Sequence, residues 1–163
     1  RDDAAYAERA QRISELTKDL SELLPELLPA LKERIAPQKA QAQGLMAFHP
    51  PCTLQHGQQL KGGVEQHLGA LGFTVRVAKT EAHLCCGSAG TYNLDQPETA
   101  HSLGAQKAQA ALAALGGGEG VVASGNIGCL TQLRVHLEKI GSPVRVRHTM
   151  QVLRDAYGPE KKF

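Results

Sequence analysis

The chain has 163 residues, with 18 basic and 16 acidic side chains, four cysteines, three phenylalanines, three tyrosines and no tryptophan. This length suits one compact domain that needs no disulfides for stability. The formal charge of +2, with scattered basic residues, argues against nucleic-acid binding, and the few aromatics argue against base stacking. No stretch has the apolar length of a membrane span. Because the chain opens on a helical pattern, without methionine or a signal peptide, we expect a piece of a longer cytoplasmic protein.

The first part of the chain, residues 1–43, is expected to be a helical segment cut from an upstream domain. Apolar residues recur at helical spacing over residues 3–24, which predicts an amphipathic helix. Pro25 and Pro29 are expected to break this helix, and a shorter second helix follows them. The polar residues 38–44 then predict a linker.

The remaining part, residues 44–163, alternates between strand and helix patterns. Short apolar runs predict strands at residues 45–49, 73–78, 121–123 and 144–146. Helical patterns follow them at residues 55–71, 97–115, 130–140 and 150–157. This alternation predicts an α/β fold with a four-stranded parallel sheet flanked by helices, a three-layer arrangement like that of Rossmann and flavodoxin folds. Ligands of such sheets bind outside the carboxyl ends of the strands, where the strand order reverses.

All four cysteines follow predicted strands. Cys52 comes after the first strand, Cys85 and Cys86 lie in the loop after the second, and Cys129 begins the helix after the third. Parallel strands end at one edge of the sheet, so these cysteines are expected to converge there. Converging thiolates predict a metal or redox site. Helix N-termini at two of these positions favour negative charge, which suits an anionic thiolate-held cluster.

Three kinds of centre remain open from the residues alone. Structural zinc usually uses Cys-x-x-Cys knuckles, and the chain has none. A thiol–disulfide centre usually uses the same Cys-x-x-Cys motif, which this chain lacks. The adjacent Cys85 and Cys86 are easier to place on a polynuclear iron–sulfur cluster than on one small tetrahedral ion. The alternatives to an electron-transfer cluster are a zinc-stabilised docking module and a centre that reduces a disulfide or quinone directly.

Three segments carry a resemblance to a known family. They are His49–Gly57 (HPPCTLQHG), His83–Tyr92 (HLCCGSAGTY) and Asn126–Cys129 (NIGC). These segments resemble the cysteine-rich CCG domain, which recurs in heterodisulfide reductases and in lactate- and glycolate-oxidising complexes. They are most similar to the iron–sulfur subunits of glycolate oxidase. The resemblance extends over essentially the whole chain, and the Cys-Cys-Gly segment is its specific part.

The resemblance implies an oxidoreductase subunit whose iron–sulfur cluster relays electrons from flavin-containing glycolate oxidase subunits toward a respiratory acceptor. The glycolate chemistry itself then belongs to the flavin subunits. An upstream ferredoxin-like domain of the same chain is also implied, as is peripheral association with the inner face of the membrane through the complex. The broad family pattern ends in Cys-x-x-Cys, but this chain has Asn126 at the first of those positions. Four thiolates favour an ordinary [4Fe-4S] cluster over a five-thiolate, non-cubane one.

The expected metal ligands are Cys52, Cys85, Cys86 and Cys129. Polar and glycine positions expected to support these ligands are His49, His56, His83, Gly87 and Asn126. Each flanking histidine has the alternative of being an ordinary loop residue, and Asn126 can make an Asx turn instead of contacting a cluster sulfur. Histidines within predicted helices, expected on the surface, are His67, His101 and His136.

Overall fold

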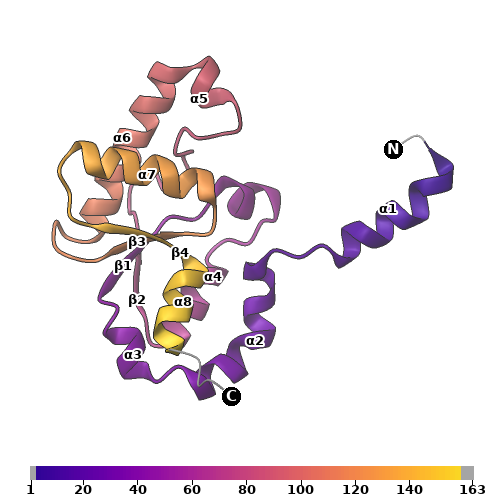
Figure 1. Ribbon diagram of the computed structural model, residues 1–163, viewed down its shortest axis with the longest axis horizontal. Helices are drawn as coiled ribbons and strands as arrows, with labels where there is room; N and C mark the ends of the chain where they lie inside the picture. Colours follow the sequence, from indigo (N-terminus) through magenta and orange to yellow (C-terminus); the bar gives the residue numbers. More distant parts are fainter. Residues whose placement is uncertain (1–2, 159–163) are drawn as a thin grey trace.

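The computed structural model describes residues 3–158 and shows a three-layer α/β fold (Figure 1). Its four strands are β1 (Leu45–Phe48), β2 (Thr74–Val77), β3 (Val121–Ser124) and β4 (Arg145–His148). They form one parallel sheet in the order β2-β1-β3-β4. The predicted fold class is therefore confirmed, and all four predicted strands are present within a few residues of their expected bounds.

The strand order reverses between β1 and β3. The chain moves outward from β1 to β2 and then returns to the other side of β1, where Met46 pairs with Val121 and Phe48 with Ala123. β3 is buried along its whole length, as expected of a central strand in a covered parallel sheet. The carboxyl ends of β1 and β3 therefore lie side by side at the topological switch point.

Helices cover both faces of the sheet (Figure 1). One layer contains α2 (Leu20–Arg34), α4 (Gly63–Ala70) and α8 (Thr149–Tyr157); the other contains α6 (Pro97–Ala114) and α7 (Ile127–Lys139). Phe48 and Leu68 belong to the hydrophobic cluster of the first layer, and Val122 and Leu133 to that of the second. Short helices α3 (Pro37–Gln41) and α5 (Tyr92–Asp95) complete the connections.

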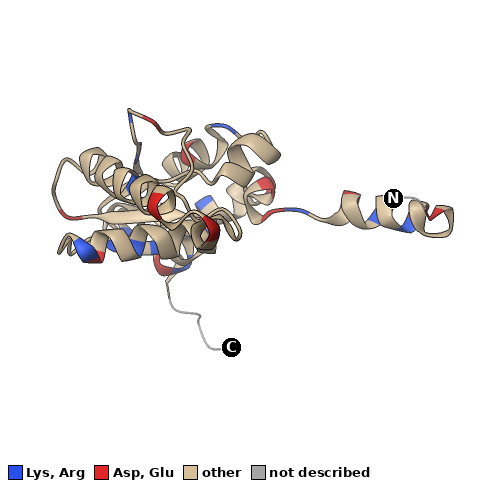
Figure 2. Cartoon of the chain, turned by 90° about the horizontal axis from the view of Figure 1, so that it is seen from above, with Lys and Arg blue, Asp and Glu red and all other residues tan. Residues whose placement is uncertain are grey.

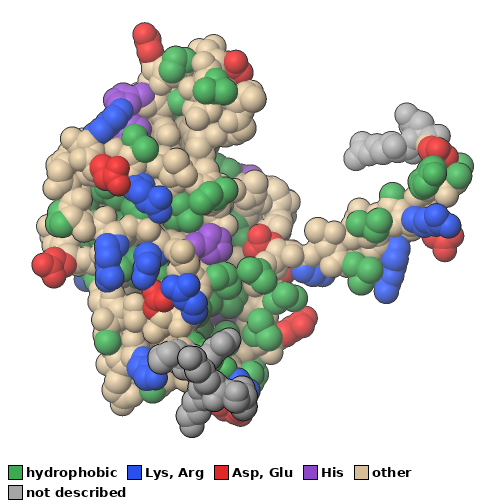
Figure 3. Space-filling view, viewed as in Figure 1, with side chains coloured by type: hydrophobic (Ala, Val, Ile, Leu, Met, Phe, Trp, Pro, Cys, Tyr) green, Lys and Arg blue, Asp and Glu red, His purple; other side chains and the backbone are tan. Residues whose placement is uncertain are grey.

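The N-terminal helix is shorter than the sequence pattern predicts. α1 (Ala4–Leu16) ends where the Thr17 hydroxyl donates to the Ile13 carbonyl at 2.8 Å. Asp19 then starts a second helix, because its side chain accepts from the Ser21 N–H while the Glu22 side chain accepts from the Asp19 N–H. α1 extends away from the body of the protein (Figure 1), and apolar side chains stay on its surface (Figure 3).

The prediction that Pro25 and Pro29 break the helix was wrong. Both lie inside α2, which continues to Arg34. Each proline removes one backbone donor, but the capping box at the start of α2 and the burial of Leu24 against the first hydrophobic cluster favour the helix. The predicted linker also contains a short helix, α3, whose Ala40 is fully buried. The predicted domain boundary near residue 43 stays a prediction.

The predicted helix over residues 55–71 is divided in two. A π-helical turn, η1 (Thr53–Gly57), follows the first cysteine, and α4 begins only at Gly63. Between them Gln59 and Gly62 have φ values of 57° and 76°, which a right-handed helix does not accommodate. The chain therefore bends sharply beside the carboxyl end of β1.

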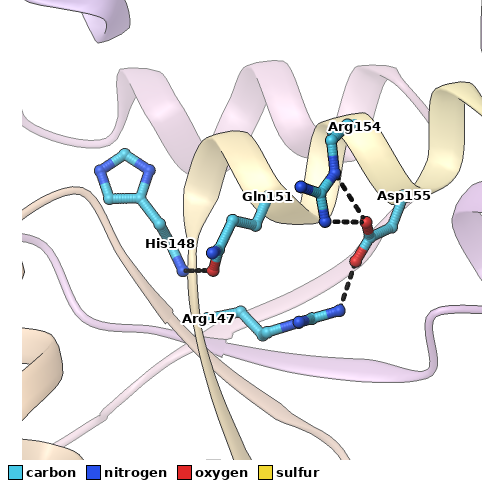
Figure 4. Close-up of polar contacts among 5 residues, drawn as sticks. All are labelled: Arg147, His148, Gln151, Arg154 and Asp155. Atoms are coloured by element: carbon cyan, nitrogen blue, oxygen red, sulfur yellow. Dashed lines mark hydrogen bonds and ion pairs between the residues drawn. The ribbon is translucent and has the colours of Figure 1, made fainter.

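The junction of β4 and α8 is held by polar contacts (Figure 4). Gln151 accepts from the His148 N–H at 3.0 Å, so the start of α8 is capped. Arg147 and Arg154 both bind the Asp155 carboxylate. These contacts, with the Arg154 hydrogen bond first, lower the pKa of Asp155. Arg147 is half-buried, whereas Arg145, the other arginine of the strand, is exposed.

Charges of both signs are spread over the helices and loops (Figure 2). The formal charge of +2 is therefore not gathered on a single face in this view. Among residues 3–158, no helix combines the length and hydropathy needed to cross a bilayer.

Candidate metal centre

The cysteines lie where the sequence predicts, at the carboxyl ends of the strands. Cys52 is the residue before η1, and Cys85 and Cys86 occupy the loop between β2 and α5. Cys129 lies in the first turn of α7, directly after β3. All four are free thiols. The pKa of Cys129 is raised by its hydrogen bond to Cys86, by burial, and by the charges of Cys52 and Cys85. Three independent loops thus bring the thiols together at the switch point of the sheet.

Cys86 and Cys129 form a buried inner pair, with 1% and 5% of their surfaces exposed. A hydrogen bond from Cys129, with contributions from His49 and Ser88, lowers the pKa of Cys86 to about 3. The Ser88 hydroxyl lies 3.2 Å from the Cys86 Sγ. The same bond to Cys86, together with burial, raises the pKa of Cys129. The two thiols therefore differ in direction, because the environment favours the thiolate at Cys86 and the protonated thiol at Cys129.

Cys52 and Cys85 form a half-buried outer pair. Burial, followed by the neighbouring Cys85, raises the pKa of Cys52 to about 11. The Cys85 Sγ accepts from the Gly87 N–H at 3.3 Å, which fixes this sulfur relative to the loop backbone. Cys52 thus holds its proton more firmly than a free thiol, and the outer pair faces solvent in part, unlike the inner pair.

His49 joins the inner pair. A ring nitrogen of His49 and the Sγ atoms of Cys86 and Cys129 all lie within 4.8 Å of one another. His49 has 7% of its surface exposed, and the backbone N–H of this residue donates to the Ala123 carbonyl at 2.8 Å. The Nε2 atom and the neighbouring Ser124 Oγ are buried without a hydrogen-bond partner among the described residues. Buried polar atoms are normally paired, so these two orphaned atoms fit a site that holds a bound group.

Backbone features hold the cysteine loops in place. Asn126 caps α7, and its Oδ1 accepts from the Cys129 N–H at 3.2 Å, so the structure assigns this side chain the local role of a helix cap. Gly87 has a φ of 88°, and a Cβ there would lie 2.3 Å from the Ala100 carbonyl oxygen of α6. Only glycine lets the cysteine loop approach α6 this closely.

The other flanking histidines do not join the inner pair. The His56 Nε2 lies 3.3 Å from the His83 carbonyl oxygen, so His56 links η1 to the cysteine loop. The His83 side chain is exposed. Of the three histidines near the cysteines, His49 alone belongs to the compact group found among residues 3–158.

Lys107 is a site residue that the sequence reasoning missed. It lies on the buried side of α6 with 5% of its surface exposed, and its Nζ donates to the Glu81 carbonyl in the cysteine loop. Burial lowers its pKa, while the thiols of Cys52, Cys86 and Cys85 oppose that shift. A signal was present: Lys107 falls on the helical stripe of small residues that α6 buries, namely Ala100, Gly104, Ala108 and Ala111.

His136 was expected on the surface but is 4% exposed. Its ring lies under His101, with centroids 4.6 Å apart, at the place where Gly104 lets α7 approach α6. Burial, followed by the charges of His101 and Lys139, lowers its pKa. The prediction was wrong because the space for the His136 ring exists only where Gly104 of α6 lacks a Cβ. Spacing along α7 does not show that Gly104 lies opposite His136.

Comparison with protein families gives the same result as the geometry. A family model for the cysteine-rich domain CCG matches residues 46–134, a span that contains all four cysteines and Lys107. The chain belongs to the CCG family. The CCG match covers more than half of the chain, so the predicted family is confirmed.

Relatives of this CCG domain include an iron-sulfur subunit and a lactate utilization protein. The glycolate oxidase iron-sulfur subunit of Escherichia coli (strain K12) is 42% identical over 160 residues, which are 98% of this chain and 36% of that protein. Lactate utilization protein A of Bacillus thuringiensis (strain Al Hakam) is 24% identical over 158 residues, which are 94% of this chain and 61% of that protein. The chain thus spans less than two thirds of either relative. No solved structure matches it.

Proposed function

We propose that Cys52, Cys85, Cys86 and Cys129 hold a [4Fe-4S] cluster, and that this CCG domain relays electrons inside a glycolate-oxidising complex. The observation that carries the proposal is the convergence of four thiols from three loops at the switch point of the sheet. Four cysteine thiolates are the usual ligand set of such a cluster, which supplies one-electron transfer when bound. The relative that is named as an iron-sulfur subunit supports this assignment.

The chain's own residues prepare the site for an anionic group. The positive end of the α7 dipole meets Cys129, and Asn126 fixes that helix start. The surroundings of Cys86 lower its pKa and so favour the thiolate, which is the form of cysteine that binds metal. The unpartnered His49 Nε2 is buried beside these sulfurs and is available as a donor to a cluster sulfide or thiolate.

The fuel, the partners and the location are further parts of the proposal. We infer glycolate rather than lactate because the glycolate oxidase subunit is the more similar of the two relatives, at 42% against 24% identity. The partners would be flavin-containing glycolate oxidase subunits and a ferredoxin-like domain upstream in the same chain. The location would be cytoplasmic, at the inner face of the membrane through the complex.

The test is the metal and sulfide content of anaerobically reconstituted protein, with its absorption spectrum. We expect about four iron and four sulfide per chain, lost in Cys86→Ser and kept in His67→Gln, a histidine change on α4 outside the site. Circular dichroism of the metal-free variants checks that both remain folded. One zinc per chain and no sulfide would overturn the cluster assignment.

A zinc-stabilised docking module is the second candidate, and one observation favours it. His49, Cys86 and Cys129 bring one nitrogen and two sulfur donors within 4.8 Å of one another, a mixed set that zinc accepts. This candidate makes His49 a ligand. His49→Gln would then abolish zinc uptake, whereas a cluster held by four cysteines would survive the change with an altered potential.

A further inference from the structure

Lys107 is the one lysine, arginine or carboxylate side chain that is buried among residues 3–158. Its stem lines a small pocket with Ala47, His49 and Pro50, the residues that lead from β1 to the first cysteine. Its ammonium group donates to the Glu81 carbonyl, in the loop that leads from β2 to the adjacent cysteines. Lys107 therefore lies between the two loops that carry Cys52 and the adjacent cysteines.

A buried ammonium group needs compensating negative charge. Moving an unpaired charge out of water is so unfavourable that buried charges in proteins are normally paired. No carboxylate within ion-pair distance of Lys107 is found among the described residues, and Glu81 contributes its backbone carbonyl. The groups that oppose the lowering of the Lys107 pKa are the cysteines Cys52, Cys86 and Cys85 and the exposed Glu81 carboxylate. A thiolate-held cluster beside these cysteines would supply the compensating negative charge.

We propose that Lys107 is the buried counter-cation of the metal centre, which offsets the negative charge of the thiolate-held cluster and favours its reduced state. This inference rests on the proposed function. One-electron reduction adds one negative charge to the cluster, so a fixed positive charge nearby stabilises the reduced form more than the oxidised form. Lys107 therefore raises the midpoint potential and strengthens cluster retention, although it ligates no iron.

A mechanical role for Lys107 is the alternative that the experiment must separate from the electrostatic role. Its hydrogen bond to the Glu81 carbonyl fastens the cysteine loop to α6, in the same way that Gly87 packs on Ala100. A neutral side chain of similar length removes both the charge and this bond. An arginine keeps the charge and a donor. The two roles differ in what they predict for metal-free protein.

The experiment compares Lys107→Met and Lys107→Arg with Lys79→Met. Lys79 is an exposed lysine in the loop between β2 and α5, which also contains Glu81 and the adjacent cysteines. Three quantities are measured on each chain: iron and sulfide after anaerobic reconstitution, the midpoint potential by redox titration, and the melting temperature of metal-free protein. For Lys107→Met we expect a more negative midpoint potential, a several-fold faster loss of iron to a chelator, and a metal-free melting temperature equal to or above that of wild type. Lys107→Arg should restore most of the potential, and Lys79→Met should leave all three quantities unchanged.

The failures of the two ideas are distinguishable. If the wild-type chain takes up zinc and no sulfide, the proposed function fails and this inference fails with it. If wild type and Lys107→Met both hold a cluster at the same midpoint potential, the counter-cation role is wrong while the proposed function stands. A lower melting temperature of metal-free Lys107→Met with an unchanged potential would assign Lys107 the mechanical role alone.

Discussion

Two basic side chains are buried against α6, and their surroundings differ. Lys107 projects from α6 toward the cysteine loop, where Gly87 packs on Ala100; we call this the site contact. His136 projects from α7 onto Gly104; we call this the helix contact. Burial lowers the pKa of both bases. Sulfurs of the metal centre oppose the shift at Lys107, whereas His101 and Lys139 add to it at His136.

This difference in surrounding charge distinguishes a buried base that indicates function from one that only packs. At the helix contact the base has only cationic or neutral neighbours acting on it, so it stays neutral and serves packing. At the site contact the neighbours that act on the base are cysteines and Glu81, which favour its charged form. Burial alone therefore does not distinguish a functional base from a structural one; the sign of the surrounding charge does.

The largest expected effect is at the site contact. Gly87→Ala would place a Cβ 2.3 Å from the Ala100 carbonyl oxygen at a φ of 88°, so both a backbone clash and left-handed strain arise. We expect a loss of about 3 kcal/mol or more in the free energy of unfolding, measured by urea denaturation of metal-free protein. The control is Gly90→Ala, at a φ of 54° with no described atom within 4 Å of the added Cβ, which should lose about 1–2 kcal/mol. Equal losses would show that the close approach to α6 is not what requires glycine.

The matching change at the helix contact should cost less. Gly104→Ala places a Cβ 2.4 Å from the His136 Nε2, and a side chain can yield where a backbone carbonyl cannot. Overpacking of about 1–3 kcal/mol is partly offset by the better helix propensity of alanine, so we expect a net loss of about 1–2 kcal/mol. In a double-mutant cycle, His136→Ala should remove most of this loss because it removes the clashing ring. Additive losses in the double variant would contradict the packing explanation.

Asn126→Ala tests the cap that joins the site to α7. The change removes the acceptor for the Cys129 N–H, and we expect it to destabilise the chain by about 1 kcal/mol. Asn126→Asp should keep most of the stability, since its side chain still accepts this bond. Asn93→Ala, on the short helix α5, is the matched control and should change stability little. If Asn126→Ala is as stable as wild type, the cap does not position Cys129.

The smallest expected effect is a pH dependence at the helix contact. The pKa of His136 is lowered from its ordinary value of 6.5, so unfolded protein takes up a proton there before folded protein does. The stability due to neutral His136 is therefore complete above pH 6.5 and declines as the pH falls toward the lowered pKa, by less than about 1.4 kcal/mol per pH unit. Urea denaturation at pH 7.5 and 5.5 should give a smaller difference for His136→Leu than for wild type. Equal differences would mean that His136 charges as readily in the folded chain as in the unfolded one.

Sequence patterns predicted the strands better than the helices. β1 and β3 are short, mainly apolar runs, whereas β2 and β4 combine valine with arginine, and all four appear close to their expected bounds. Helix bounds failed where local capping competed with periodicity, as at Asp19, and where residues with positive φ interrupted an otherwise helical stretch, as at Gln59 and Gly62. Pro25 and Pro29 were given too much weight, because a capped and partly buried helix continues through them.

The sequence by itself determined the alternation of strands and helices, the family, and the positions of the four cysteines directly after strands, since all of these are local or motif properties. Only the tertiary structure decided the strand order, which brings the ends of β1 and β3 together, and the division of the thiols into an inner and an outer pair. It also decided that His49 and Lys107 face the site while His56 and His136 do not. Burial and charge environment depend on which distant segments meet across the sheet edge, and spacing along one chain does not contain that information.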